Sequence, residues 1–293
     1  MDYVLYVTSL VAVYGVLTVS LNLVVGYTGV LSVAHAAFMG IGAYTTALLL
    51  TDGGINFFFT LPVGVAIAGA VAAALAASTL RLKGDYYIIG SFGFQVIMYS
   101  IFLNWIGLTK GPFGIRNIPK PRAFGFAFDD PARFAMLALA FLGVCLWVAR
   151  RVGESPYGKV LRAIREDEVG AASIGKDVRR YKVSIFVVSA MLASIGGSLY
   201  AGLISYVDPF AFTVNESIFL QALVIIGGAG NVYGSVVGAA VLIVLPEVLR
   251  FFDVPASVAS PIREILYGTL MILFLRFRPK GLLPERITPG LAR

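Results

Sequence analysis

The sequence predicts an all-α membrane protein, a polytopic bundle of about 8–10 transmembrane helices. Three observations support this fold class. The chain has 293 residues, of which 58% are hydrophobic and 13% charged, and its mean hydropathy of +0.86 is far above that of a water-soluble fold. Long runs without Asp, Glu, Lys or Arg alternate with short charged patches. Two of these runs are interrupted by glycine-rich segments, which predicts broken helices.

The charge-free runs supply the predicted spans. A spanning helix needs roughly 20 apolar residues at about 1.5 Å each, so the first and sixth runs are long enough for two helices apiece. This gives about nine spans in a single transmembrane domain that covers residues 1–293. The runs are residues 3–51, 53–80, 86–109, 134–149, 183–207, 217–246 and 265–275.

The loop of residues 150–182 is predicted to be cytoplasmic. It holds the densest Lys and Arg cluster of the chain, and cytoplasmic loops are enriched in these residues. Counting spans from this loop places the loop of residues 107–133 outside, the N-terminus outside and the C-terminus inside. The net charge of +7 is therefore interpreted as membrane topology and not as affinity for nucleic acid, so the expected surroundings are the lipid bilayer.

The glycine-rich interruptions lie at residues 26–29 (GYTG) and 227–231 (GGAGN). Inside hydrocarbon, backbone outside a helix leaves its polar groups unpaired unless it is buried in protein or lines a wet cavity. These segments are either loops at the membrane surface or breaks within it. A weak echo between the residues after Tyr27 and those after Tyr206 suggests an inverted repeat, in which discontinuous helices meet near the midplane.

Polar residues predicted at membrane depth form the candidate translocation pathway, because such residues are expensive in lipid and mark solute routes. Asp208 and Glu216 bring the only nearby carboxylates, and both are placed near a membrane boundary. His35 is more often a hydrogen-bonded interior residue than a ligand or proton carrier. One histidine and one cysteine, Cys145, are too few for a usual zinc or iron–sulfur site, so no metal is expected. The candidate pathway residues are Asn22, Tyr27, Thr28, Ser32, His35, Gln95, Tyr206, Asn215, Ser217 and Gln221.

Residues 155–182 contain a predicted short amphipathic helix. Ser155 and the proline after it favour a start, Gly175 favours a stop, and between them lies a partial apolar stripe of Leu161, Ile164 and Val169. This helix either lies on anionic lipid through its arginines or docks on another protein. The small residues 170–173 favour protein docking, because they permit close approach.

Several motifs resemble those of the branched-chain amino acid (Liv-type) ABC importer permeases. GYTGVLSVAHAAFMGIGAY at residues 26–44 resembles the opening signature of that family, and GPFGI at residues 111–115 resembles its outer-loop motif. SPYGKVLRAIREDEVGAASIG at residues 155–175 resembles its coupling loop. IIGGAGNVYGSVVGAAVLIVLPEVLR at residues 225–250 and FRPKGLL at residues 277–283 resemble its C-terminal third. The matches follow the order of the family along nearly the whole chain.

The resemblance implies a subunit of the prokaryotic cytoplasmic (inner) membrane with several partners. These are a second, related permease, two cytoplasmic ATPases and a periplasmic or lipoprotein substrate-binding protein. It places Tyr27, Ser32 and His35 in a broken second helix beside the pathway. The positions that it assigns to ATPase coupling are Arg162, Glu166, Ala171, Ala172 and Gly175.

Together these observations predict a non-catalytic permease subunit of an ATP-driven importer for a small polar solute. Branched-chain or other neutral amino acids are the first expectation. Urea, short amides or small carboxylates are the alternative, because Val30 stands where the family commonly has glutamine. No GxxxxGK[ST] motif occurs, so ATP is expected on the partner subunits and no cofactor on this chain.

Two competing classes are weaker. An ion-coupled transporter or channel usually needs a carboxylate at mid-membrane, and the sequence places none securely there. An intramembrane enzyme needs a nucleophile with a base in reach, and no such pair is evident in the sequence.

Overall fold

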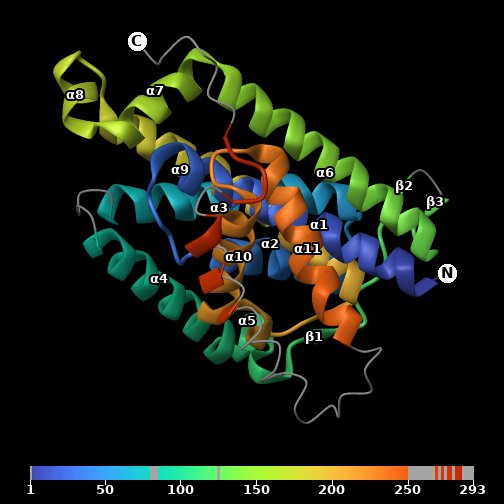
Figure 1. Ribbon diagram of the computed structural model, residues 1–293. Coiled ribbons are helices and arrows are strands. Elements are labelled where there is room, and N and C mark those ends of the chain that lie inside the picture. Colours follow the sequence, from blue (N-terminus) through green and yellow to red (C-terminus); the bar gives the residue numbers. More distant parts are fainter. Residues whose placement is uncertain are drawn as a thin grey trace.

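The structure is a computed structural model, and it describes residues 2–79, 85–123, 126–249, 268–269, 272–273, 276–278 and 281–285. Within these residues nearly all of the chain is helical, which confirms the predicted all-α polytopic fold (Figure 1). Five described helices are long and apolar enough to cross a membrane: α1 (Asp2–Thr28), α3 (Phe57–Thr79), α4 (Asp85–Asn104), α6 (Pro131–Glu154) and α9 (Val178–Ile204).

Three shorter apolar helices complete the bundle: α2 (His35–Thr51), α10 (Val214–Gly227) and α11 (Val232–Leu249). The pair α10 and α11 is bent by 117° and forms a sixth candidate span if it is counted as one. The first six charge-free runs thus contain the helices or helix pairs predicted for them. Most of the seventh, residues 265–275, lies outside the described residues.

The two ends of the bundle carry different connections (Figure 1). At one end lie α7 (Pro156–Glu166) and α8 (Glu168–Ser173), which belong to the predicted cytoplasmic loop. The opposite end holds the N-terminal end of α1 and the predicted outer loop, which agrees with an outside N-terminus. The outer elements are α5 (Ile106–Thr109), η1 (Gly111–Phe113), β1 (Ile115–Arg116), β2 (Arg122–Ala123), β3 (Phe126–Ala127) and β4 (Tyr206–Val207). After β4, η2 (Pro209–Phe212) leads inward, and its Phe212 is fully buried. Strand β1 pairs antiparallel with β4, and β2 pairs antiparallel with β3.

Two parts of the chain share one plan, as the weak echo in the sequence suggested. Helices α1 and α9 each have 27 residues, and each is followed by an irregular segment and then by a short helix, α2 or α10. Helix α1 ends at the α7 end of the bundle, whereas α9 ends beside the outer strands, so the two parts run in opposite directions. This arrangement has the form of an inverted repeat with discontinuous helices.

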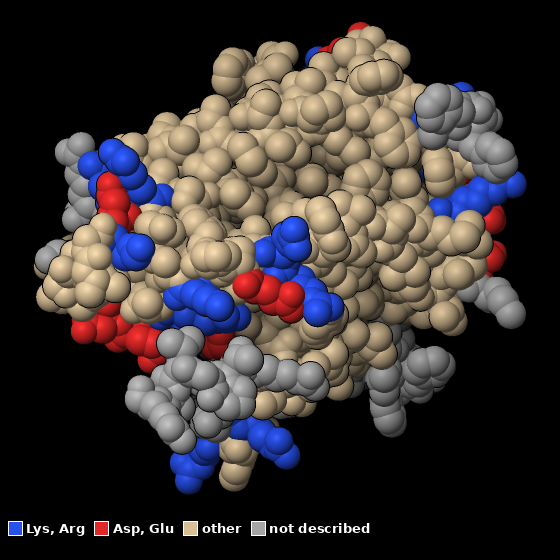
Figure 2. Space-filling view, turned by 90° about the horizontal axis from the view of Figure 1, so that it is seen from above, with Lys and Arg blue, Asp and Glu red and all other residues tan. Residues whose placement is uncertain are grey.

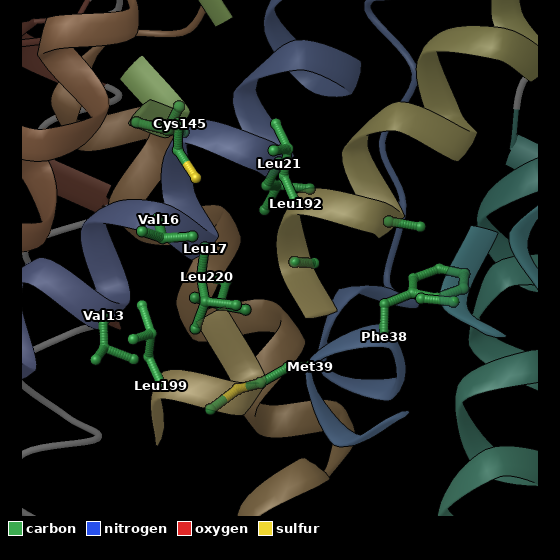
Figure 3. Close-up of a cluster of buried hydrophobic side chains, with 14 of the residues drawn as sticks. Val13, Val16, Leu17, Leu21, Phe38, Met39, Cys145, Leu192, Leu199 and Leu220 are labelled. Carbon is green, nitrogen blue, oxygen red and sulfur yellow. The ribbon is translucent and has the colours of Figure 1, made fainter. Parts of the chain in front are cut away.

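The core lies where α9 packs against α1, α2 and α3. Glycines make the closest approach possible, since a Cβ on Gly197 would overlap the Met39 carbonyl and one on Gly42 would overlap the Ser194 carbonyl. Figure 3 shows the apolar side chains that fill the centre, and they come from α1, α2, α6, α9 and α10: Val13, Val16, Leu17, Leu21, Phe38, Met39, Cys145, Leu192, Leu199 and Leu220.

Candidate functional site

The first turn of α2 meets the first turn of α10 in the middle of the bundle. The Ala36 amide donates to Ser217 Oγ at 3.0 Å, and the Ala37 amide donates to Gln95 Oε1 at 2.8 Å. The Gln95 side chain also donates to the Phe212 carbonyl at 2.8 Å. Gln95 lies midway along α4, about 15 Å from either end at 1.5 Å per residue. Both short helices therefore begin near the middle of this candidate span, which is the predicted level of the bilayer midplane.

Side chains also satisfy the irregular segment of residues 29–34 that precedes α2. Ser91 Oγ accepts from the Val33 amide at 3.1 Å, and the Gln221 side chain donates to the Ser32 carbonyl at 2.7 Å. Unpaired backbone groups at this depth would each cost several kcal/mol, roughly, in lipid. We call Ser91, Gln95, Ser217 and Gln221 the junction cluster, because they pair the backbone groups that the interrupted helices leave open.

His35 joins α2 to α1. Its Nε2 lies 2.7 Å from Ser20 Oγ, and the Ser20 hydroxyl donates onward to the Leu17 carbonyl at 2.7 Å. Because that hydroxyl proton is already used, the ring nitrogen is assigned as the donor in the first bond. The Ser189 hydroxyl adds a bond from α9 to the Ser20 carbonyl at 2.6 Å. These contacts fit the interior interpretation of His35.

The two predicted glycine-rich breaks pack against each other at the α7 end. Helix α1 continues through Gly26 and ends at Thr28, so the irregular segment begins at Gly29. Asn22, which is fully buried, accepts from the Gly230 amide at 2.8 Å and donates to the Asn231 carbonyl at 2.9 Å. A Cβ on Gly26 would overlap the Gly230 nitrogen, so this approach requires glycine.

A cavity of about 1100 Å³ opens beside these breaks. We call it the cytoplasmic cavity, because it lies at the end that carries the predicted cytoplasmic loop. Tyr27 lines it, and the Arg162 guanidinium carbon lies 4.8 Å from the centre of the Tyr27 ring. Thr28 instead donates to the Val24 carbonyl of its own helix. Figure 2, which views the molecule from the side of α6 and α7, shows charged side chains in separate patches with broad uncharged areas between them. Other lining residues are Arg150, Glu154, Lys159, Asn231 and Tyr233.

The candidate pathway residues therefore fall into several groups. Ser32, His35, Gln95, Ser217 and Gln221 lie at or beside the meeting of α2 and α10. Asn22, Tyr27 and Thr28 lie at the cytoplasmic end of α1.

Two further candidates are separate from both groups. Tyr206 is on the outer side, where its hydroxyl donates to the Phe113 carbonyl at 3.2 Å and the Arg116 guanidinium lies over its ring. Asn215 is exposed on the surface of α10.

The predicted position of Glu216 is wrong. The sequence placed it near a membrane boundary, but it precedes Ser217 of the junction cluster and its carboxylate bonds to the Tyr14 side chain, which lies about 20 Å from either end of α1. Its Oε1 is buried without a hydrogen-bond partner among the described residues. The boundary was misjudged because the sequence does not show that α10 begins inside the bundle.

The cytoplasmic loop folds as two short helices. Ser155 caps α7 by accepting from the Gly158 amide at 3.2 Å, and Asp167 caps α8 by accepting from the Gly170 amide at 2.9 Å. Gly175 ends the unit with a φ of +81°, a left-handed conformation that favours glycine. The predicted start and stop are thus in place, with a break at Asp167 that the sequence analysis did not anticipate.

That break corrects the predicted apolar stripe. Leu161 and Ile164 of α7 are buried, but Val169 is 79% exposed. Asp167 has extended backbone angles, so α8 starts a new helical phase and turns Val169 outward. Ile174, 71% exposed, lies at the other end of α8 and was missed by the sequence analysis. We call Val169, Ala172 and Ile174 the apolar tip.

The predicted coupling residues differ in exposure. Ala172, Gly175 and Glu166 are exposed, whereas Ala171 is buried. Arg162 turns inward. The loop is fastened to α9, because Lys182 pairs with Glu168 at 2.7 Å and the Tyr157 hydroxyl donates to the Tyr181 carbonyl at 3.1 Å.

The outer loop is fastened to α9 by Lys120. Its ammonium donates to the carbonyls of Gly202 and Leu203, at 3.2 and 2.9 Å, in the last turn of that helix. Burial lowers the pKa of Lys120, and the Asp129 carboxylate partly offsets this. Three large apolar side chains of the same region are exposed at the outer end: Trp105, Ile106 and Phe113.

A multi-pass bundle with interrupted helices at membrane depth and an exposed apolar tip on its cytoplasmic loop has the build of a membrane permease. The family described as the permease component of the branched-chain amino acid transport system matches residues 3–275. The chain belongs to this family, the Liv-type ABC importer permeases, as its motifs predicted. It is a multi-pass protein of the inner membrane.

Individual relatives agree with this assignment. The chain is 35% identical to the high-affinity branched-chain amino acid permease LivM of Escherichia coli K12, over 95% of this chain and 69% of LivM. It is 26% identical to the probable LivM of Methanocaldococcus jannaschii, over 96% and 93% of the two chains. It is also 24% identical to the high-affinity branched-chain amino acid permease LivH of Escherichia coli K12, over 92% of this chain and 91% of LivH.

Proposed function

We propose that this chain, with ATPases bound at its cytoplasmic loop, imports a small polar solute. The observation that carries the proposal is the apolar tip. Its side chains are exposed. They lie on a loop that is joined to α9 by an ion pair, and both helices of this loop have side-chain N-caps. A group of exposed apolar side chains on a loop that is held in place by such contacts is typical of a protein docking surface.

The alternative, a loop lying on lipid, accounts less well for these contacts. Lipid binding would use the basic residues of α7. Arg162 and Arg165 instead form ion pairs within the protein. A partner ATPase with an apolar groove therefore fits α8 better than an anionic bilayer does.

The relatives and the outer surface support the other proposed partners. Similarity to both LivM and LivH supports pairing with a second, related permease. The exposed Trp105, Ile106 and Phe113 offer a surface on the outer end for a substrate-binding protein. The names of these relatives favour branched-chain or other neutral amino acids as the solute, and Val30 keeps urea, short amides and small carboxylates as the alternative. Calorimetry of the cognate binding protein against leucine, urea and acetate would decide between them.

The docking test uses Ala172→Trp in the complete importer, reconstituted in vesicles with ATP inside. Because Ala172 is exposed, we expect normal folding and membrane insertion. ATP-driven uptake should fall at least about tenfold, since a bulky ring at the docking surface displaces the partner. Ala74→Trp, on an exposed position of α3, is the matched control and should retain uptake. Uptake by Ala172→Trp equal to that of the control would show that α8 is not the docking surface.

Glu216 is the specific observation that favours a second candidate, an ion-coupled transporter. A carboxyl group at mid-depth with an unpartnered oxygen among the described residues is the feature that such coupling uses. Uptake by this chain alone, in ATP-free vesicles under a proton or sodium gradient, would support that candidate. Uptake that requires the ATPases and ignores the gradients would exclude it.

A further inference from the structure

Residues 281–285, here called the C-terminal strap, close the cytoplasmic end of α10. The Leu282 amide donates to the Ile226 carbonyl at 2.8 Å, and the Leu283 amide donates to the Gly227 carbonyl at 3.0 Å. These carbonyls belong to the last turn of α10, where helix carbonyls lack donors of their own. The strap therefore caps a helix from which it is more than fifty residues away in sequence.

The strap places a carboxylate between two arginines of α7. Glu285, 13% exposed, puts Oε1 at 2.6 Å from Arg162 Nε and Oε2 at 2.8 Å from Arg165 Nη2. The first contact is an ion pair without hydrogen-bond geometry. Burial of Arg165 disfavours its charge, but the carboxylates of Glu285 and Glu166 more than compensate, so the pKa of Arg165 is raised. Removing one partner of such a shielded group costs more than breaking a surface pair, because it leaves partly buried charge uncompensated.

The same arginine reaches the end of α1. Arg165 Nη1 donates to the Gly26 carbonyl, in the last turn of that helix. On the other side of the carboxylate, a Cβ on Gly230 would lie 2.7 Å from Glu285 Oε2, so the α10–α11 break is in contact range as well. One carboxylate thus stands where α7, the end of α1 and the α10–α11 break come together.

Among the described elements, helix α7 packs mainly on α1, α6, α8 and α9. The ion pairs of Glu285 connect α7 to the strap, and the strap in turn caps α10. We propose that Glu285 is a positioning residue that locks α7 to this break, so that displacement of the cytoplasmic loop moves both interrupted helices together. The inference rests on the proposed function, because the displacement is attributed to an ATPase at the apolar tip.

The test compares Glu285→Gln with Glu154→Gln in the complete, reconstituted importer. Glutamine keeps the size of the side chain and the backbone caps of the strap, but it removes the charge. Glu154 is the matched control because it pairs with Arg150 in the same cavity and is 66% exposed. In Glu285→Gln we expect the solute imported per ATP hydrolysed to fall roughly three- to tenfold, with ATP hydrolysis retained. The control should keep the wild-type ratio.

Hydrogen exchange on the same complexes gives a readout that a merely structural role would not move. Trapping the ATPases with vanadate should change amide exchange in both α7 and residues 226–231 of the wild-type complex. In Glu285→Gln the change should stay in α7. A break that responds as in the wild type, or uptake and hydrolysis that fall only in proportion to assembled complex, would overturn the inference. If the wild-type complex shows no ATP-dependent uptake, the proposed function fails first; a normal ratio in the variant defeats only the role of Glu285.

Discussion

Replacing Asn22 with leucine should loosen the contact between α1 and the α10–α11 break. Asn22 is fully buried, and its side chain pairs one backbone donor, the Gly230 amide, and one backbone acceptor, the Asn231 carbonyl. Leucine has the same branching and the same number of heavy atoms, so no cavity forms and both groups lose their partner. Each stranded buried group costs about 1–3 kcal/mol.

The loss of stability from both groups together should lie in the lower half of the range of about 2–6 kcal/mol that two such groups give. Gly230 and Asn231 line the cytoplasmic cavity, where water can replace part of each lost bond. Side-chain hydrogen bonds within membranes also contribute only about 0.6–2 kcal/mol each. We therefore expect a loss of about 2–3 kcal/mol in the free energy of unfolding.

The measurement is reversible unfolding of the purified permease by sodium dodecyl sulfate in mixed micelles. Asn104→Leu is the matched control, since Asn104 is exposed and its side chain donates to the Ser100 carbonyl of its own helix. That variant should change stability by less than about 0.5 kcal/mol. Equal stability of the Asn22 and Asn104 variants would refute the reasoning, because the break would then hold its position without the Asn22 side chain.

Two further substitutions examine the same architecture. His35→Ala removes the bond to Ser20 and leaves a cavity, so the free energy of unfolding should fall by roughly 2–3 kcal/mol. The ranking of competing solutes in uptake assays should stay unchanged. A stable variant with an altered ranking would instead place His35 on the solute route. Gly26→Ala puts a Cβ into the Gly230 backbone and should sharply lower the yield of folded permease, measured by size-exclusion chromatography. The control Gly143→Ala should fold normally, because a Cβ at Gly143 meets open space. Equal yields of the two variants would show that the two breaks separate at little cost.

The sequence predicts the helices well because the formation of each helix depends on the residues of its own segment. A charge-free run of sufficient length must span or be buried, and the first six runs contain the expected helices. The breaks at Gly29 and Gly228 lie in the two glycine-rich segments that predicted them, and both residues have the positive φ that glycine adopts without strain. The cap at Ser155 and the stop at Gly175 follow from equally local rules.

Features that depend on distant partners escaped the sequence analysis. Nothing in the order of residues shows that α10 begins beside the centre of α4, so Glu216 was placed at a boundary. The outward turn of Val169 depends on one extended residue, Asp167, which a helical stripe ignores. Glu285 gains its surroundings only because the strap folds back onto α7 and α10.

The interrupted helices show why polarity alone does not identify a solute route. Physical principle allows irregular backbone at membrane depth in two settings, within protein or beside water. Gln95 and Ser217, both fully buried, pair backbone groups of α2 and η2, which is the first setting. A side chain occupied in this way has few bonds left to offer a solute. Asn215 differs, because its amide is exposed on α10 only two residues from Ser217. An exposed amide so near the midplane is costly against lipid, so among the predicted pathway residues Asn215 is the one whose position most needs polar surroundings.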